Sequence, residues 1–259
     1  MTSAATPAAR RVAWRPATVA RIIEETPTAR TLVLDVQDWP GHRAGQHVDV
    51  RLTAEDGYQA QRSYSIASAP RDLALALTVE RLEDGEISSY LCGDVRVGDR
   101  FELRGPVGGY FVWDVDDGGP LLLVAGGSGI VPLMAMLRHR ASSLTDESTR
   151  RALPARLLYS SRRWSDVIYR DELERLVASD PTVQVTHTIT REPPQDWTGF
   201  RRRIDRAMLV DVAWPPDERP RAYICGPTPL VETVASELAA LGHEPAFIRT
   251  ERFGPTGNP

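Results

Sequence analysis

The pattern of hydrophobic and polar residues differs between the two halves of the chain. From Ala17 to Arg104, short runs alternate apolar with polar residues, and glycine-containing turns separate them. Alternation with a period of two is typical of strands that bury one face, and such turns connect antiparallel neighbours. The runs begin at positions 17, 31, 47, 73 and 100. We therefore predict an antiparallel β-barrel or sandwich for this part of the chain.

The pattern of hydrophobic and polar residues changes after Asp114. Strand-length runs that are apolar throughout begin at Leu121, Arg156 and Ala222, and helix-length segments separate them. Strands buried on both faces have this composition, because helices cover a parallel sheet on each side. The second half is predicted to be an α/β domain with a parallel sheet. The boundary is placed near residues 115–119, where charge and glycine interrupt the periodicity, so the two domains are 1–115 and 116–259.

Charge and composition narrow the classes of partner. All 31 cationic side chains are arginine, and the formal net charge is -4. The chain lacks the basic surface expected for nucleic acid or an anionic membrane, and it has no lysine for a phosphate loop. The longest apolar run, Leu121 to Ala125, is far too short to span a bilayer. We expect a monomeric cytoplasmic protein with no membrane and no nucleic-acid partner.

Thiol and imidazole side chains give no sign of a metal site. The two cysteines, Cys92 and Cys225, cannot ligate an iron–sulfur cluster, which normally takes four thiolates. The five histidines are scattered without metal-ligand spacing. We predict no metal site and assign no histidine a catalytic role.

A glycine turn follows the first apolar strand. The sequence AGGSGIVP at 125–132 leads into a segment with apolar residues at helical spacing. Strand, turn and helix start place free backbone N–H groups and the positive end of the helix dipole at one point, which favours a diphosphate. Pro132 takes the third position of the dinucleotide fingerprint, so the motif is incomplete. A nucleotide site and a simple turn both fit this motif alone.

The second apolar strand ends in arginine rather than an acid. In a dinucleotide site, the residue at this point determines which ribose is bound: an acid binds the 2′-hydroxyl of NAD, whereas an arginine binds the 2′-phosphate of NADP. Here the strand ends in YSSRR at 159–163. The arginines favour NADPH over NADH, although a solvated arginine pair is the simpler alternative.

Two motifs in the first half suit a flavin nucleotide. In RSYSI at 62–66, Arg62 and Tyr64 share one face of a predicted strand, which places a guanidinium for phosphate beside an aromatic plane for a ring system. GEISSYL at 85–91 opens a short helix with amides and hydroxyls in its first turn. The alternatives are a core tyrosine with a surface arginine, and an ordinary serine cap.

Taken in order, these motifs resemble the ferredoxin-NADP reductase family. The resemblance is carried by RSYSIAS (62–68), GEISSYL (85–91), GPVGGYF (105–111), AGGSGIVP (125–132), YICGP (223–227) and ERF (251–253). It extends from about Ala17 to Phe253. The implied fold is an FAD-binding antiparallel β-barrel domain followed by an NAD(P)-binding α/β domain.

The resemblance also implies roles for individual residues of the flavin site. Arg62 would bind the FAD diphosphate, Tyr64 would stack on the isoalloxazine, and Ser65 would lie near flavin N5. Phe253 would cover the opposite flavin face. The remaining implied flavin-site residues are Ser63, Val79, Glu80 and Arg81, on the strand segments, and Gly85, Glu86, Ile87 and Ser88, around the phosphates.

The nucleotide site is implied in the same way. The residues that would cradle the pyridine nucleotide or lie beside its nicotinamide are Gly127, Ser128, Gly129, Cys225, Gly226 and Pro227. The implied ligands of a 2′-phosphate are Arg162, Arg163, Arg191 and Arg203. Glu251 would lie near the N5 edge, so the implied catalytic residues are Ser65, Cys225 and Glu251.

The resemblance implies an oxidoreductase that passes a hydride from NAD(P)H to FAD and then releases single electrons. The sequence ends at Pro259 without a four-cysteine ferredoxin-like domain and without a terminal aromatic residue. We therefore expect a separate electron acceptor, which could be a ferredoxin, a flavodoxin, an oxygenase component or a molybdenum-enzyme component. The alternatives are a flavin or ferric reductase acting on small molecules and a non-catalytic nucleotide-binding regulator.

Overall fold

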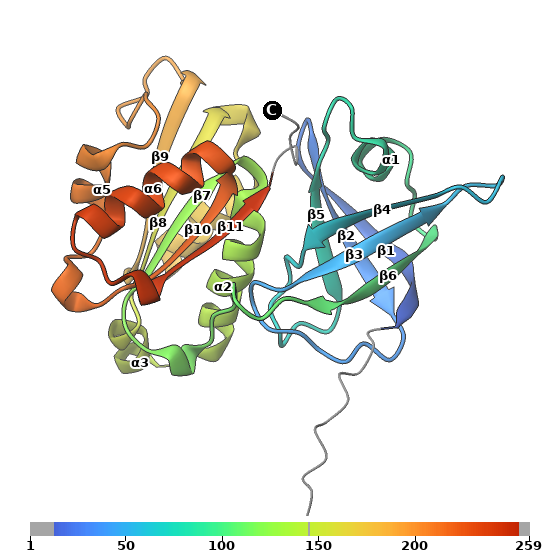
Figure 1. Cartoon of the computed structure of the whole chain (residues 1–259), viewed down its shortest axis with the longest axis horizontal. Helices are drawn as coiled ribbons and strands as arrows, with labels where there is room; N and C mark the ends of the chain where they lie inside the picture. The colour runs from blue at the N-terminus through green and yellow to red at the C-terminus, as the bar shows by residue number, and fades with distance from the viewer. Residues whose placement is uncertain (1–12, 145, 254–259) are drawn as a thin grey trace, which may run out of the picture.

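The alternating runs of the first half form an antiparallel sheet in the computed structural model, which describes residues 13–144 and 146–253. Its six strands have the order β4-β3-β6-β1-β2-β5, and the two edge strands meet through a bridge between Ile66 and Leu77. The sheet therefore curls into the predicted barrel (Figure 1). The strands are β1 (Trp14–Thr26), β2 (Ala29–Val36), β3 (His47–Thr53), β4 (Gln59–Ser65), β5 (Leu75–Glu80) and β6 (Arg100–Val107). Helix α1 (Glu86–Gly93) buries Ile87 and Leu91 in the barrel core.

The second half forms a parallel sheet with the order β11-β10-β7-β8-β9. Its strands are β7 (Leu121–Gly126), β8 (Ala155–Arg163), β9 (Val183–Glu192), β10 (Arg221–Pro227) and β11 (Ile248–Phe253). The chain continues from β7 to β8 on one side and returns to β10 on the other. Ligands bind at such a reversal, beyond the carboxyl ends of the strands. The expected two-domain architecture is confirmed.

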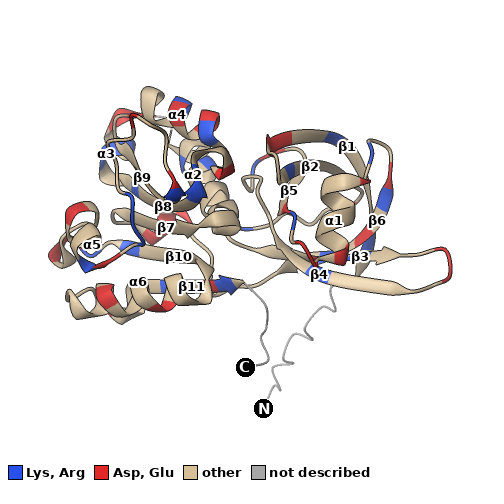
Figure 2. Ribbon diagram, turned by 90° about the horizontal axis from the view of Figure 1, so that it is seen from above, with Lys and Arg blue, Asp and Glu red and all other residues tan. Residues whose placement is uncertain are grey.

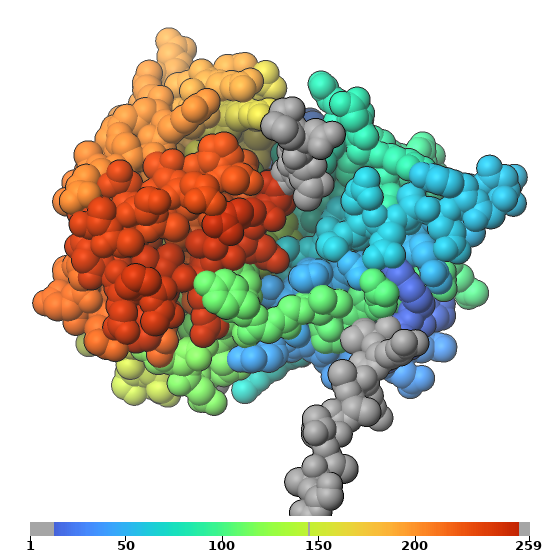
Figure 3. All heavy atoms as spheres, viewed as in Figure 1, coloured from blue at the N-terminus to red at the C-terminus, as the bar shows by residue number. Residues whose placement is uncertain are grey.

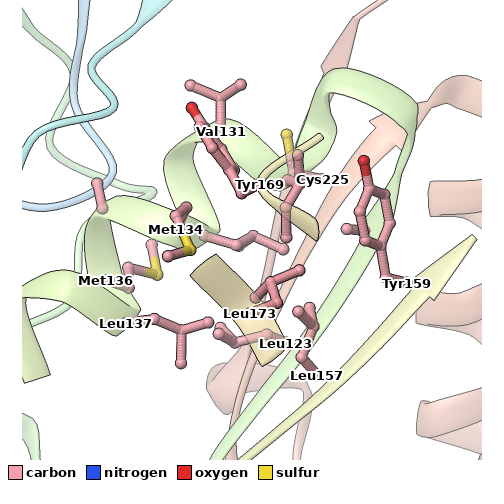
Figure 4. Close-up of a cluster of buried hydrophobic side chains, with 14 of the residues drawn as sticks. Leu123, Val131, Met134, Met136, Leu137, Leu157, Tyr159, Tyr169, Leu173 and Cys225 are labelled. Carbon is pink, nitrogen blue, oxygen red and sulfur yellow. The ribbon is translucent and has the colours of Figure 1, made fainter. Parts of the chain in front are cut away.

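Helices cover both faces of the parallel sheet, as its continuous apolar strands predict. Leu121 and Leu123 face one core, whereas Leu122 and Val124 face another. Figure 4 shows the first of these cores, where Val131, Met134 and Leu137 of one helix pack over the sheet. The helices are α2 (Ile130–Ser143), α3 (Glu147–Ala152), α4 (Arg170–Ser179), α5 (Arg206–Val212) and α6 (Thr228–Ala240).

Strand β5 contributes side chains to both domains. Leu75, Leu77 and Val79 lie in the barrel core, because they share one face of the strand. The opposite face points to the second domain, where Ala76 lies in the core beneath α2. The two domains are therefore joined by a packed interface as well as by the connecting chain, which runs as a green segment between them in Figure 3.

A chain of buried hydroxyl groups crosses this interface. Tyr169, the residue before α4, has a left-handed φ of 60°, and its hydroxyl donates to Oγ1 of Thr78 on β5. The Thr78 and Thr31 hydroxyl oxygens are 2.7 Å apart, and Thr31 donates to Oε1 of Glu25 at 2.6 Å. Because each hydroxyl has one proton, the bonds run in one direction and end on the carboxylate of Glu25. These hydrogen bonds link the second domain to the barrel.

Candidate active site

The predicted flavin-binding residues of β4 lie on an edge strand. Arg62 is exposed, and its guanidinium donates to the carbonyl of the adjacent Gln61 at 2.8 Å. In the described ranges it forms no ion pair, so its charge remains available to an anion. Tyr64 is half-buried beside the barrel core, and burial raises the pKa of its phenol. A free guanidinium beside a flat, uncharged ring fits an aromatic nucleotide with a diphosphate.

Ser63 of β4 already forms a hydrogen bond within the barrel. The Ser63 hydroxyl donates to Oδ1 of Asp49 at 2.6 Å, and Oδ2 of Asp49 is 2.7 Å from Arg104 Nη2. These partners lower the pKa of Asp49 although its burial opposes them. The hydroxyl of Ser63 therefore supports β3 and β4, and its predicted role at the cofactor is untested.

The start of α1 lies close to β4 and β5, as the GEISSYL motif requires. No side chain caps its first N–H groups, which leaves the positive end of the helix free for an anion. The Ser88 hydroxyl is turned inward, donating to the Gly85 carbonyl at 3.1 Å and accepting from Leu82 N–H at 3.2 Å. Any phosphate at this point would therefore meet backbone N–H groups rather than the Ser88 side chain.

The three predicted flavin-site residues at the end of β5, residues 79–81, have different surroundings. Val79 is buried in the barrel and Arg81 is exposed to solvent. The Glu80 carboxylate instead reaches the second domain, where Oε2 accepts from the backbone N–H of Ser128 at 3.2 Å. The prediction that Glu80 lines the flavin is untested, but its contact in this structure belongs to the glycine turn.

The glycine turn meets the end of β10 at very short range. Gly127 has a φ of 54°, which favours glycine, and the turn passes directly into α2. A Cβ atom on Gly129 would lie 2.1 Å from the Cys225 carbonyl oxygen, so only glycine fits there. The predicted nucleotide residues at 127–129 and 225–227 are thus brought together at the reversal of strand order.

The three predicted catalytic residues also converge. Cys225 of β10 is the register partner of Glu251 of β11. Glu251 Oε1 lies 3.9 Å from His47 Nδ1 of β3, and the register partner of His47 in β4 is Ser65. Strands β10 and β11 of the second domain therefore meet strands β3 and β4 of the barrel at these side chains.

Burial controls the protonation of this junction. It raises the pKa of Glu251 to about 7, and it raises the pKa of the Cys225 thiol, with Glu251 adding to that shift. It also lowers the pKa of His47. Glu251 Oε2 is buried and has no hydrogen-bond partner among the described residues. An unpartnered carboxyl oxygen that titrates near neutrality fits a bound polar group.

His47 is the residue at this junction that the sequence does not reveal. Its contact with Glu251 joins two segments far apart in the chain, and no local pattern predicts that contact. The Asp56-Gly57 turn between two strand-like runs predicts the hairpin that pairs His47 with Ser65. That no histidine has a catalytic role stays a prediction.

Three of the predicted 2′-phosphate ligands lie at the ends of β8 and β9, on the same carboxyl edge of the parallel sheet as the glycine turn. Arg162 and Arg163 end β8, and Arg191 lies at the end of the neighbouring parallel strand β9. Arg163 pairs with Glu192, with Nε and Oε1 2.9 Å apart, whereas Arg162 and Arg191 are exposed. The segment with Arg203 follows a parallel bridge between Phe200 and Thr188 of β9.

The remaining predicted position, Phe253, ends β11 as the register partner of Pro227 and has 37% of its surface exposed.

The charge on the surface of the molecule is mixed, because acidic and basic residues are interspersed over both domains (Figure 2). No helix in the ranges 13–144 and 146–253 has the length and apolar character needed to cross a membrane.

Two family models match the two domains. The oxidoreductase FAD-binding domain matches residues 17–112, and the oxidoreductase NAD-binding domain matches residues 123–236. The chain therefore joins an oxidoreductase FAD-binding domain to an oxidoreductase NAD-binding domain. The chain belongs to the ferredoxin-NADP reductase family. The predicted family and cofactor classes are confirmed.

Named relatives match the chain across both domains. The glycine betaine monooxygenase reductase subunit of Chromohalobacter salexigens is 32% identical over 91% of this chain and 63% of its own length. The ferredoxin reductase component of 3-ketosteroid-9-alpha-monooxygenase from Rhodococcus rhodochrous is 30% identical over 93% of this chain and 66% of its own. This chain thus spans about two thirds of each of those proteins.

Among solved structures, the FAD/NAD-binding domain of nitric oxide dioxygenase from Vibrio cholerae has a TM-score of 0.80 and 25% identity. The match covers 95% of this chain and 100% of that domain.

Proposed function

We propose that this protein is a reductase that takes electrons from NAD(P)H and passes them to a separate redox protein. Bound FAD would accept a hydride from the reduced nicotinamide and release the electrons one at a time. The observation that carries the proposal is the junction at which Cys225 and Glu251 of the second domain face His47 and Ser65 of the barrel. The two cofactor sites would share this junction.

The side chains at the junction have separate tasks in this proposal. The buried, neutral thiol of Cys225 keeps water and charge away from the path between the two cofactors. Glu251 would hold a proton at Oε2, because its carboxyl group is half protonated near pH 7. Arg62 and the first turn of α1 would hold the FAD diphosphate, with Tyr64 against the ring system.

We further propose that the electron acceptor is an oxygenase component or a ferredoxin-type carrier. The relatives named above support this choice, because one is the reductase subunit of a monooxygenase and the other is a ferredoxin reductase component. We propose 1–115 and 116–259 as the two functional units, with β6 ending at Val107 and β7 beginning at Leu121. We also propose that the protein acts as a monomer.

The test compares acceptors under one set of conditions. FAD-loaded protein is supplied with NADPH or NADH, and reduction of purified carrier proteins is measured beside reduction of free flavin and of ferric chelates. We expect faster reduction of at least one carrier protein. A clear preference for free flavin or ferric iron would replace the proposal with a small-molecule reductase, and failure to bind FAD would leave a non-catalytic regulator.

A further inference from the structure

The carboxylate of Glu80 occupies an anion position in the second domain. Its Oε2 accepts from the Ser128 N–H at 3.2 Å, in the glycine turn that opens α2. Glu80 belongs to β5 of the barrel, so this bond crosses the domain interface. In the described part of the chain, no basic side chain lies within ion-pair distance of this carboxylate. Among the described residues, its polar partner is thus a backbone N–H rather than a basic side chain.

The position of this carboxylate follows from the strand that carries it. Alternate residues of β5 point to the second domain, so Ala76, Thr78 and Glu80 share one face. Ala76 is buried in the second core and Thr78 is held by Tyr169. With both neighbours fixed, the Glu80 side chain is directed at the turn. It lies close to Gly127 as well, since a Cβ atom there would be 3.6 Å from Oε2.

We propose that Glu80 competes with the diphosphate of the pyridine nucleotide for the glycine turn, and so sets how tightly this protein binds its nucleotide. The inference rests on the proposed function and on the predicted role of residues 127–129 in cradling the nucleotide. The turn offers few N–H groups, and a carboxylate and a diphosphate are both acceptors with negative charge. Nucleotide binding must therefore displace Glu80 or tolerate its repulsion.

The expected effect is large enough to measure. Two unit charges about 6 Å apart, at an effective dielectric constant of roughly 40, repel with an energy that corresponds to about tenfold in affinity. Glu80→Gln removes the charge and retains an oxygen that can accept from Ser128 N–H. We expect this variant to bind NADP⁺ and NAD⁺ each about tenfold more tightly than wild type. The two nucleotides share the diphosphate, so their affinity ratio should stay the same.

The experiment titrates FAD-loaded protein with NADP⁺ and, separately, with NAD⁺, and follows the flavin absorbance or the heat of binding. Glu83→Gln is the matched control, because Glu83 is an exposed acid three residues further along. It changes the net charge equally and should leave both dissociation constants unchanged. Repeating the titrations in high salt should shrink the difference between wild type and Glu80→Gln, because salt screens charge repulsion.

Three results would overturn the proposal. Unchanged or weaker nucleotide binding by Glu80→Gln would show that the charge does not compete. Equal tightening by Glu83→Gln would show a general effect of net charge. An altered FAD affinity with unchanged nucleotide affinity would return Glu80 to the flavin site. If no protein in the set bound either nucleotide, the proposed function would fail together with this inference. The first three results would overturn the inference only and would leave the proposed function unaffected.

Discussion

The hydroxyl chain between the domains offers a quantitative test of the interface. Thr78→Val keeps the shape of the side chain but removes the middle hydroxyl, so the buried Tyr169 hydroxyl loses its acceptor. A buried donor without a partner costs roughly 1–3 kcal/mol. Tyr169→Phe leaves Thr78 able to donate to Thr31, and it should cost only about 1 kcal/mol.

The double variant distinguishes this chain from two independent contacts. Removing both hydroxyls leaves Thr31 still donating to Glu25, so the combined cost should fall about 1 kcal/mol short of the sum. Free energies of unfolding from denaturant titration measure all three values. A loss of about 2 kcal/mol corresponds to roughly 4–8 °C in Tm for a protein near this size.

The control is Thr53→Val, which changes an exposed threonine of β3. It should alter the free energy of unfolding by less than about 0.5 kcal/mol. The reasoning is refuted if Thr78→Val costs no more than this control. It is also refuted if the two single costs add to the double cost within about 0.5 kcal/mol.

Three further predictions concern the site. Because burial raises the pKa of Glu251 from its ordinary range to about 7, Glu251 binds more protons in the folded state than in the unfolded state between these values, and its own contribution to stability should fall as pH rises from about 5 to 7. Burial lowers the pKa values of His42, His47, His187 and His243, and these contribute with the opposite sign, so the fall due to Glu251 is measured as the difference between wild type and variant. Glu251→Gln should abolish that fall in denaturant titrations at successive pH values; a parallel pH profile would contradict the assignment. Arg62→Ala should weaken FAD binding by about tenfold to a hundredfold, corresponding to roughly 1.5–3 kcal/mol for a charge-assisted contact, while the exposed Arg96→Ala leaves FAD titrations unchanged. Arg162→Ala should raise the NADPH Michaelis constant several-fold and leave that for NADH nearly unchanged in steady-state kinetics, since only NADPH has the 2′-phosphate. Equal losses with both nucleotides would show that Arg162 has a structural role.

Local patterns in the sequence predict much of this fold. Continuous apolar runs predict the parallel strands β7, β8 and β10, because helices cover both faces of these strands. The glycine turn before α2 follows from residue types that allow a tight turn, as Gly127 does with its φ of 54°. These features depend on neighbouring residues only.

Contacts between distant segments escape this kind of prediction. The approach of Glu251 to His47 depends on how β11 docks against the barrel, and the bond from Ser128 to Glu80 depends on the same docking. In the sequence, Glu80 is one acid at the end of an apolar run. Its alternation with Val79 shows that it faces away from the barrel core, but not which group it meets there.

Because β5 presents opposite faces to two cores, the two domains cannot melt independently without cost. Loss of the second domain would expose Ala76 and the hydroxyl of Thr78, while loss of the barrel would leave Tyr169 without its partner. Calorimetry of the intact chain should therefore record one heat-absorption peak rather than two. The amides of β5 should exchange with deuterated solvent at the rate set by global unfolding. A protein built in this way keeps its two cofactor-binding domains in one cooperative unit.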